Sequence, residues 1–318
     1  MQVAILGAGP AGMTCANALL TFGIDAVVIE RDALPGGAQR TNFHPNLWLL
    51  GTPEETGREV TERMVRHFRS LPIPLYLNAD LGHVSRDSSR FRLEFTTRPN
   101  VIEATDSARS AIEADAVVLA TGMRPRATPR LLALAETSRR VIIGPLADAI
   151  RDDIRNARVL ILGGGDNALD HALYLAERGN RIDVCTRGRF TARPGFLGAC
   201  ANSASIVLHT QCSPPVITAN ASHLMAAGPR GSEQYDWLLV MYGYQPNTEV
   251  LSRFDTALHP TLTAGGHIKT DTWQRTSVAG LYAAGDLTES IQPSVATAIA
   301  QGLAVARAIE RIGHQDSA

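Results

Sequence analysis

The hydrophobic pattern of the chain contains the same order of elements twice. An apolar run at residues 3–6 ends at a glycine-rich turn, a helical pattern follows, and this order begins again at residues 159–162. Apolar residues lie on one face of each predicted helix: Cys15, Ala18, Leu19 and Phe22 in the first copy, and Leu169, Ala172, Leu173 and Ala176 in the second. Each helix ends near a glycine, and a second apolar strand follows, at 26–29 and at 181–185. Two strand–helix–strand units predict parallel sheets with right-handed crossovers.

Further apolar runs complete the predicted α/β fold. They predict strands at residues 75–77, 83–84, 91–95, 117–120, 238–241 and 280–286, the last ending in a turn, and an amphipathic helix at 296–312. Two crossings between domains are expected near 121–124 and 242–246. The first domain would then be discontinuous, with residues 1–120 and 246–318, and the second domain, residues 121–245, would be inserted into it.

The first glycine-rich turn has the chemistry of a dinucleotide site. Gly7, Gly9 and Gly12 form a Gly-x-Gly-x-x-Gly string, which alone is weak evidence because it recurs in glycine-rich loops. After a strand and before a helix, the first glycine allows the tight turn, the second lets a pyrophosphate approach and the third lets the helix pack closely. The helix N-terminus offers N–H groups to the phosphates. Glu30 closes the second strand, where a carboxylate accepts hydrogen bonds from an adenosine ribose.

The second copy repeats this turn with one difference. Gly163, Gly165 and Ala168 match the three glycines, but Thr186 stands where the first copy has its acid. Arg187 follows it, and Arg189 and Arg193 are close by. An arginine there can pair with a 2′-phosphate, so the second site favours NADPH over NADH. Two alternatives stay open: the arginines lie on a solvated loop, or the second turn binds no nucleotide. The predicted fold is therefore α/β with two Rossmann-like dinucleotide-binding domains.

Composition narrows the class of protein. The 318 residues carry 30 Lys+Arg against 31 Asp+Glu, a net charge of −1, which does not favour a nucleic-acid binder. No apolar run approaches the length of about 18 residues that a membrane span needs. The chain enters a strand directly after Met1, which does not resemble a signal peptide, and it has 4 cysteines without a C-x-x-C pair. We therefore expect a cytoplasmic protein that binds neither membranes nor a metal.

Five motifs in order carry a family resemblance: Gly7-Ala8-Gly9-Pro10-Ala11-Gly12, Pro35-Gly36-Gly37, Ala120-Thr121-Gly122, Gly163-Gly164-Gly165-Asp166-Asn167-Ala168 and Ala283-Ala284-Gly285-Asp286. The chain resembles the low-molecular-weight thioredoxin reductase-like flavoproteins, which include ferredoxin–NADP reductases and bacillithiol-disulfide reductase-type proteins. The resemblance covers nearly the whole chain. It implies FAD in the first domain and a nicotinamide dinucleotide in the second.

The resemblance also assigns site residues. For FAD it implies Gly7, Gly9, Pro10, Ala11, Gly12, Glu30, Arg31, Gly37, Gln39, Ala120, Thr121, Gly122, Gly285, Asp286, Ser294 and Val295. Among these, Asp286 would hold a ribitol hydroxyl, and the helix that begins near Ser294 would point at the pyrimidine end of the flavin. For NADP it implies Gly163, Gly165, Asp166, Asn167, Ala168, Thr186 and Arg187. The family's His-Arg-Arg phosphate motif is kept only at Arg187, with Thr186 in place of the histidine.

The departure from thioredoxin reductase concerns its redox dithiol. That C-x-x-C stands before the second glycine-rich turn, where residues 141–150 of this chain contain no cysteine. Electrons cannot pass through a dithiol that is absent. We expect Cys15 and Cys185 to be core residues, and nothing near Cys200 or Cys212 signals a reactive thiol.

Five aromatic or imidazole residues outside these motifs are weighed separately. His44 and Trp48 follow the Gly36-Gly37 turn, and His44 is a weak candidate for proton relay, with a surface loop as the alternative. Tyr242 and Tyr244 flank a domain crossing and are expected to pack at the hinge. His171 on the second helix is expected to be solvated.

These observations predict an FAD-dependent NAD(P)H oxidoreductase. It would pass electrons directly from flavin to an external acceptor: a ferredoxin or flavodoxin, a quinone, or a small disulfide. A homodimer is expected. The alternative is an FAD-binding protein of the same fold that uses no pyridine nucleotide, either a flavin-dependent dithiol oxidase or a regulatory module.

Overall fold

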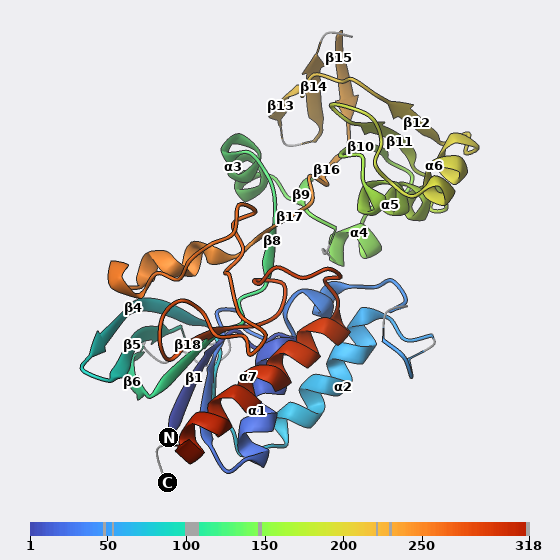
Figure 1. Cartoon of the computed structure of the whole chain (residues 1–318). Coiled ribbons are helices and arrows are strands. Elements are labelled where there is room, and N and C mark those ends of the chain that lie inside the picture. Colours follow the sequence, from blue (N-terminus) through green and yellow to red (C-terminus); the bar gives the residue numbers. More distant parts are fainter. Residues whose placement is uncertain are drawn as a thin grey trace. The chain divides into compact units, whose positions relative to one another are not determined.

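The chain folds into two compact units, each with its own parallel sheet (Figure 1). The computed structural model describes residues 1–46, 49–52, 54–98, 108–145, 148–220, 222–228 and 231–315. The first unit comprises residues 1–123 and 246–318, and the second unit comprises residues 124–245. The chain passes between them through β8 (Met123–Pro125) and β17 (Tyr244–Pro246), which pair as a two-stranded sheet.

The first unit is built on a parallel sheet of order β18-β7-β1-β2-β3. Its strands are β1 (Gln2–Leu6), β2 (Asp25–Ile29), β3 (Leu75–Tyr76), β7 (Ala116–Leu119) and β18 (Leu281–Ala283). Leu6 at the end of β1 lies opposite Ile29 at the end of β2 and Leu119 at the end of β7, so three strands end level. The glycine-rich turn and Glu30 therefore meet at one edge of the sheet.

Different layers cover the two faces of this sheet. One face packs against residues of α1 (Pro10–Thr21), α2 (Gly57–Arg69) and α7 (Val295–Gln315). The other packs against an antiparallel sheet and short 3-10 turns: β4 (Ala79–Asp87), β5 (Arg90–Thr97), β6 (Ala108–Ala114), η2 (Thr248–Arg253) and η3 (Thr256–Leu258). A third 3-10 turn, η1 (Gly37–Thr41), follows β2. Helix α7 lies along α1 because Gly302 has no side chain, and a Cβ there would collide with the Ala11 carbonyl oxygen.

The second unit repeats the parallel sheet with the order β12-β11-β10-β16-β9. The strands are β9 (Val141–Ile143), β10 (Arg158–Leu162), β11 (Arg181–Cys185), β12 (Ile206–His209) and β16 (Trp237–Val240). The helices are α3 (Pro129–Thr137), α4 (Asp148–Asp152), α5 (Asp166–Ala176) and α6 (Pro194–Ala201). One face of the sheet shares a core with an antiparallel meander of β13 (Val216–Ala219), β14 (Leu224–Gly228) and β15 (Gly231–Tyr235).

The structure confirms the two strand–helix–strand units and the parallel sheets. The predicted strand at 280–286 is shorter, because Gly280 (φ +78°) and Gly285 (φ +79°) bound it with left-handed backbone. The solvated position expected for His171 is wrong. Its side chain is buried, with Nδ1 2.8 Å from the Asn167 carbonyl oxygen and Nε2 3.2 Å from that of Pro145. Within the described part of the chain, no helix combines the length and apolar character that a bilayer crossing needs.

Candidate dinucleotide-binding sites

Two glycines of the first turn are required by the protein itself. Gly7 has a φ of +108°, and a Cβ there would collide with the Ala120 carbonyl oxygen. A Cβ at Gly12 would collide with the carbonyl oxygen of Gly7. These positions let α1 and β7 approach the end of β1 closely, as the sequence predicts for the first and third glycines of such a turn.

Gly9 differs, because nothing in the protein requires a glycine there. Its φ is −76°, and a Cβ would have no protein atom closer than the Gly37 Cα at 3.9 Å. The space in front of Gly9 is therefore open, at the N-terminus of α1, where Pro10 occupies the first helical position. A phosphate group fits this cradle, since backbone N–H groups and the helix dipole both favour an anion there.

Glu30 is held at the end of β2 by backbone hydrogen bonds. One carboxylate oxygen accepts from the Ala8 N–H at 2.7 Å and the other from the Asp32 N–H at 2.9 Å. These bonds fix the carboxylate beside the turn and leave further lone pairs for hydroxyl donors. Arg31, the next residue, points its side chain into solvent and lies 3.7 Å from the Asp32 carboxylate.

The Gly36-Gly37 turn packs on the first cradle. The Gly36 N–H donates to the Ala8 carbonyl oxygen at 2.8 Å, and a Cβ at Gly37 would come 3.1 Å from the Gly9 Cα. Gln39 uses its Oε1 to accept from Asn42 Nδ2 at 2.9 Å. The segment that follows β2 therefore returns to the pyrophosphate cradle, while Gln39 is bonded within its own turn.

A second group of predicted FAD residues gathers around the ends of β7 and β18. The Ala120 N–H donates to the Leu6 carbonyl oxygen at 2.8 Å. Thr121 Oγ1 donates to the Asn247 carbonyl oxygen at 3.0 Å, and the Asn247 N–H donates to the Gly122 carbonyl oxygen at 2.9 Å. Asp286 is partly buried beyond β18, and this burial raises the pKa of its carboxyl group, an effect that nearby His267 opposes. A hydroxyl donor would stabilise the ionised form of this carboxylate.

Gln301 connects α7 to this group, a contact that no local sequence pattern indicates. Its Oε1 accepts from the Gly285 N–H at 2.7 Å, and its Nε2 donates to Thr288 Oγ1 at 3.0 Å. Ser294 caps the helix, with Oγ accepting from the Thr297 N–H at 3.2 Å, and Val295 begins it. The turn at Gly285 and the start of α7 are thus held in one arrangement.

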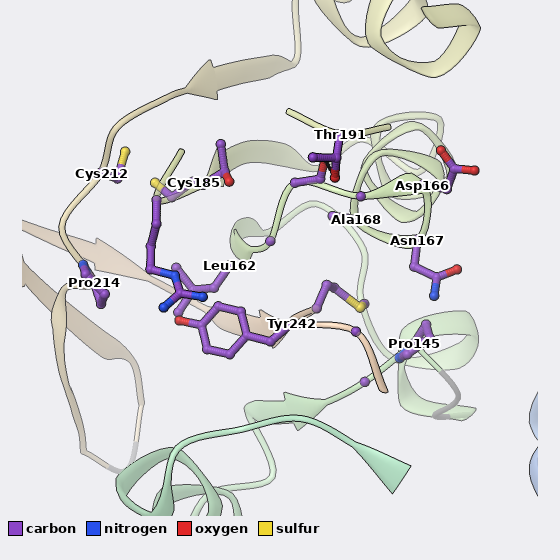
Figure 2. A pocket seen from close by; sticks show the side chains of 18 of the residues that line it. Pro145, Leu162, Asp166, Asn167, Ala168, Cys185, Thr191, Cys212, Pro214 and Tyr242 are labelled. Carbon is purple, nitrogen blue, oxygen red and sulfur yellow. Dashed lines mark hydrogen bonds between the residues drawn. The ribbon is translucent and has the colours of Figure 1, made fainter. Parts of the chain in front are cut away.

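The second unit contains a cavity of about 370 Å³ at the C-terminal ends of β10, β11 and β16 (Figure 2). In open α/β sheets, ligands bind in this position. Gly163, Gly165, Asp166, Asn167, Ala168, Thr186 and Arg187, which are all the residues predicted for NADP, line the cavity. A Cβ at Gly165 would meet no atom nearer than Thr191 Oγ1 at 3.9 Å, so this glycine repeats the open cradle of the first turn.

The loop after β11 folds back over this turn. The Thr191 and Ala192 N–H groups donate to the Gly164 carbonyl oxygen at 2.8 and 3.1 Å. Arg193 donates through its backbone N–H and its Nε to the two carboxylate oxygens of Asp166, each at 2.7 Å. Asp166 is therefore paired within the protein, and Arg193 is directed away from a phosphate role.

Arg187 remains on the open side of the cavity. Its side chain is exposed, and its guanidinium carbon lies 5.8 Å from the centroid of the Tyr242 ring. Burial raises the pKa of the Tyr242 hydroxyl, and Arg187 partly offsets this shift. Tyr242 and Tyr244, which the sequence places beside a domain crossing, also line the cavity. A tyrosine two residues beyond the end of a buried strand gives no local signal for this position.

The sequence also singles out His44, Trp48 and the four cysteines. Trp48 lies outside the described residues. The backbone N–H of His44 donates to Asn42 Oδ1 at 3.1 Å, and its ring lies 4.4 Å from that of Phe43. A role for His44 in proton relay stays a prediction. The four cysteines are free thiols, of which Cys15, Cys185 and Cys200 are buried and Cys212 is partly exposed.

Comparison with known proteins identifies the family. Residues 1–302 match the profile described as "Pyridine nucleotide-disulphide oxidoreductase". A ferredoxin–NADP reductase of Limosilactobacillus fermentum is 28% identical over 298 residues, covering 90% of this chain and 85% of that protein. A thioredoxin reductase of Buchnera aphidicola is 26% identical over 329 residues, covering 98% and 96%.

Solved structures share the fold at lower identity. The thioredoxin reductase of Lactococcus lactis superposes with a TM-score of 0.78 at 20% identity, covering 98% of this chain and 99% of that one. The bacillithiol disulfide reductase of Bacillus cereus gives 0.73 at 18% identity, covering 98% and 100%. The chain therefore belongs to the pyridine nucleotide-disulphide oxidoreductase family and is an FAD-dependent NAD(P)H oxidoreductase.

Proposed function

We propose that this enzyme oxidises NADPH and delivers the electrons to an external acceptor without a C-x-x-C dithiol relay. FAD would occupy the first unit and NADPH the second. The observation that carries the proposal is the pair of open cradles at Gly9 and Gly165, each in a turn whose other glycines serve the fold. The missing C-x-x-C at residues 141–150 separates the enzyme from dithiol relay.

The first unit supplies a group suited to each part of an FAD molecule. Gly9 and the start of α1 would hold the pyrophosphate, Glu30 the adenosine ribose, and Asp286 a ribitol hydroxyl. The N-terminus of α7, positioned by Gln301, would face developing negative charge on the ring. When bound, FAD supplies the reversible electron chemistry that joins a hydride donor to an acceptor.

The preference for NADPH follows from the end of β11. A carboxylate directly after the second strand of such a unit accepts hydrogen bonds from ribose hydroxyls, and Glu30 has this position in the first unit. The second unit has Thr186 and the exposed Arg187, whose guanidinium can donate two parallel hydrogen bonds to a 2′-phosphate. Because Arg193 is paired with Asp166, the phosphate preference rests mainly on Arg187.

Two of the four thiols, Cys15 and Cys200, are poorly suited to relay electrons. Burial raises the pKa of the Cys15 thiol. The pKa of the Cys200 thiol is raised to about 11, mainly by burial and to a smaller extent by the negative charge of Asp170. A thiol with a raised pKa is a poor nucleophile. Small redox proteins, quinones and small disulfides remain the acceptor classes, and the names of the relatives mention ferredoxin, thioredoxin and bacillithiol disulfide. A cytoplasmic location and a homodimer remain predictions from the sequence.

The proposal is tested with the purified yellow protein under anaerobic conditions. NADPH should bleach the flavin absorbance at a concentration about tenfold or more below that required for NADH. If neither nucleotide bleached a fully FAD-loaded protein, the alternative of an FAD-binding protein without a pyridine-nucleotide reaction would replace the proposal.

Direct transfer has its own test. A variant with Cys15, Cys185, Cys200 and Cys212 replaced by Ser or Ala should reduce ferricyanide or a small quinone within a few-fold of the parent, per bound FAD. A disulfide substrate is assayed in parallel. Loss of disulfide reduction alone in one Cys→Ser variant would establish a single-cysteine mechanism and contradict direct transfer.

A further inference from the structure

Two of the four thiols lie together in the wall of the second-unit cavity. Cys185 ends β11, and Cys212 lies in the connection from β12 to β13; both line the cavity. Figure 2 shows both cysteines on the same side of the cavity. In this arrangement Cys212 Sγ donates to the Thr210 carbonyl oxygen at 3.6 Å. Cys200 does not belong to this pair, because it is buried and its Sγ donates to the Leu169 carbonyl oxygen at 3.5 Å.

The backbone explains why residues far apart in sequence meet here. Cys185 lies opposite His209 in the parallel pair of β11 and β12. The Thr186 N–H then donates to the His209 carbonyl oxygen at 3.0 Å. A turn with positive φ (+53°) at Gln211 brings the chain back, so that the Cys212 N–H donates to the Thr186 carbonyl oxygen at 3.0 Å.

The two thiols differ in exposure and in backbone setting, and this difference suits a reversible disulfide. Cys185 is 7% exposed and ends a strand, whereas Cys212 is partly exposed, lies outside any strand and packs against the core that contains Cys185. Disulfide formation requires Cα atoms within about 7 Å and Cβ atoms about 4 Å apart. A small shift of the connection is easier to make than a shift of the sheet.

We propose that Cys185 and Cys212 form an intrachain disulfide on reaction with a small disulfide such as oxidised glutathione. One protein thiolate attacks the oxidant, breaks its S–S bond and releases one small thiol, which leaves a mixed disulfide. The second protein thiolate displaces the other small thiol. The two protein thiols are oxidised by two electrons, and the oxidant is reduced to two thiols.

The disulfide would weaken binding of the dinucleotide in the cavity, an effect that rests on the proposed NADPH site. Thr186 lies between the two cysteines, and Arg187 follows it. A disulfide would link the connection that carries Cys212 covalently to Cys185, two residues before Arg187. Arg187 is the residue proposed to bind the 2′-phosphate. Because linkage is reciprocal, a ligand in the cavity that hinders oxidation must bind the oxidised protein more weakly by the same factor.

The experiment uses the reduced, full-length, FAD-loaded protein with oxidised glutathione. The mass should fall by the two departing hydrogen atoms, and peptide mapping should join residues 185 and 212. Cys212→Ser and Cys185→Ser should each prevent this product, while Cys200→Ser, the matched control, should leave it intact. A stable glutathione adduct at Cys212, or no reaction at either thiol, would overturn the proposal.

Nucleotide coupling is measured separately with 2′,5′-ADP, which carries the 2′-phosphate but no nicotinamide. Saturating ligand should shift the equilibrium with glutathione about tenfold toward the reduced protein, and the oxidised protein should bind the ligand about tenfold more weakly. Equal binding by both forms would contradict the coupling. A disulfide that forms in a protein that binds no 2′,5′-ADP even when reduced would instead refute the proposed NADPH site.

Discussion

The two strand–turn–helix units have the same backbone but different chemistry at the end of the second strand. In both turns the first glycine is forced by a facing carbonyl oxygen, of Ala120 in one unit and Met241 in the other. In both, the middle glycine opens onto free space. The first unit then places a carboxylate beside its turn, and the second places a hydroxyl followed by a guanidinium. The fold thus repeats one open turn, and the two units differ in the side chains beside it.

The largest expected effect comes from filling one cradle at a time. Gly9→Val should fold, because its Cβ meets no protein atom closer than 3.9 Å, yet the protein should purify without FAD. Losing two charge-assisted hydrogen bonds to a phosphate lowers affinity by at least about a hundredfold. The ratio of flavin to protein absorbance measures the outcome.

Gly165→Val is the reciprocal variant, and it should keep FAD but lose NADPH binding. Gly198→Val, on α6, serves as the control, since a Cβ there meets no atom within 4 Å. A Gly9→Val protein with stoichiometric FAD would end the parallel between the two cradles.

A smaller effect is expected at the position that distinguishes the nucleotides. Arg187→Ala should raise the NADPH concentration needed for half-saturation about tenfold, the effect of one charge-assisted contact, and should leave NADH almost unchanged. Arg181→Ala, at the start of the same strand, is the matched control. Steady-state kinetics with both nucleotides decide the matter, and equal losses would show that Arg187 does not read the 2′-phosphate.

The smallest effect sharpens the comparison inside the second strands. Val27 in β2 is buried in apolar core, whereas Asp183 at the matching place in β11 accepts from Tyr235 Oη at 3.1 Å and from Arg158 Nη2 at 3.1 Å, with His209 Nε2 at 2.7 Å. Burial raises the pKa of Asp183, but the hydrogen bonds from these partners lower it by more, so the net direction is down.

A lowered carboxyl pKa stabilises the fold above the ordinary value of about 4 and loses this contribution as the pH falls below it. Asp183→Asn should therefore cost about 1 kcal/mol at neutral pH and make the acid side of the stability profile shallower. Urea unfolding between pH 3 and pH 7 measures both. An unchanged acid limb would mean that Asp183 titrates alike in both states.

Local patterns predicted what depends on neighbours in sequence. Gly7, Gly163 and the apolar strands beside them could be identified because turn and strand signals are local. The partners that long-range packing provides could not. Gln301 on α7 accepts a hydrogen bond from the Gly285 N–H, and Arg193 donates to the Asp166 carboxylate. Tyr242 lines the cavity. Each of these is an ordinary residue in its own segment, and only the fold gives it a partner.

The pairing of β8 with β17 gives the chain a modular character. Neighbouring strands lie about 4.8 Å apart, so the two points at which the second unit enters and leaves the chain are close together. Closing such a gap with a short turn carries little entropic cost. Residues 124–245 can therefore be replaced by another domain without breaking the first unit. Such a replacement would leave the proposed FAD site unchanged and would alter only the proposed nicotinamide-nucleotide site.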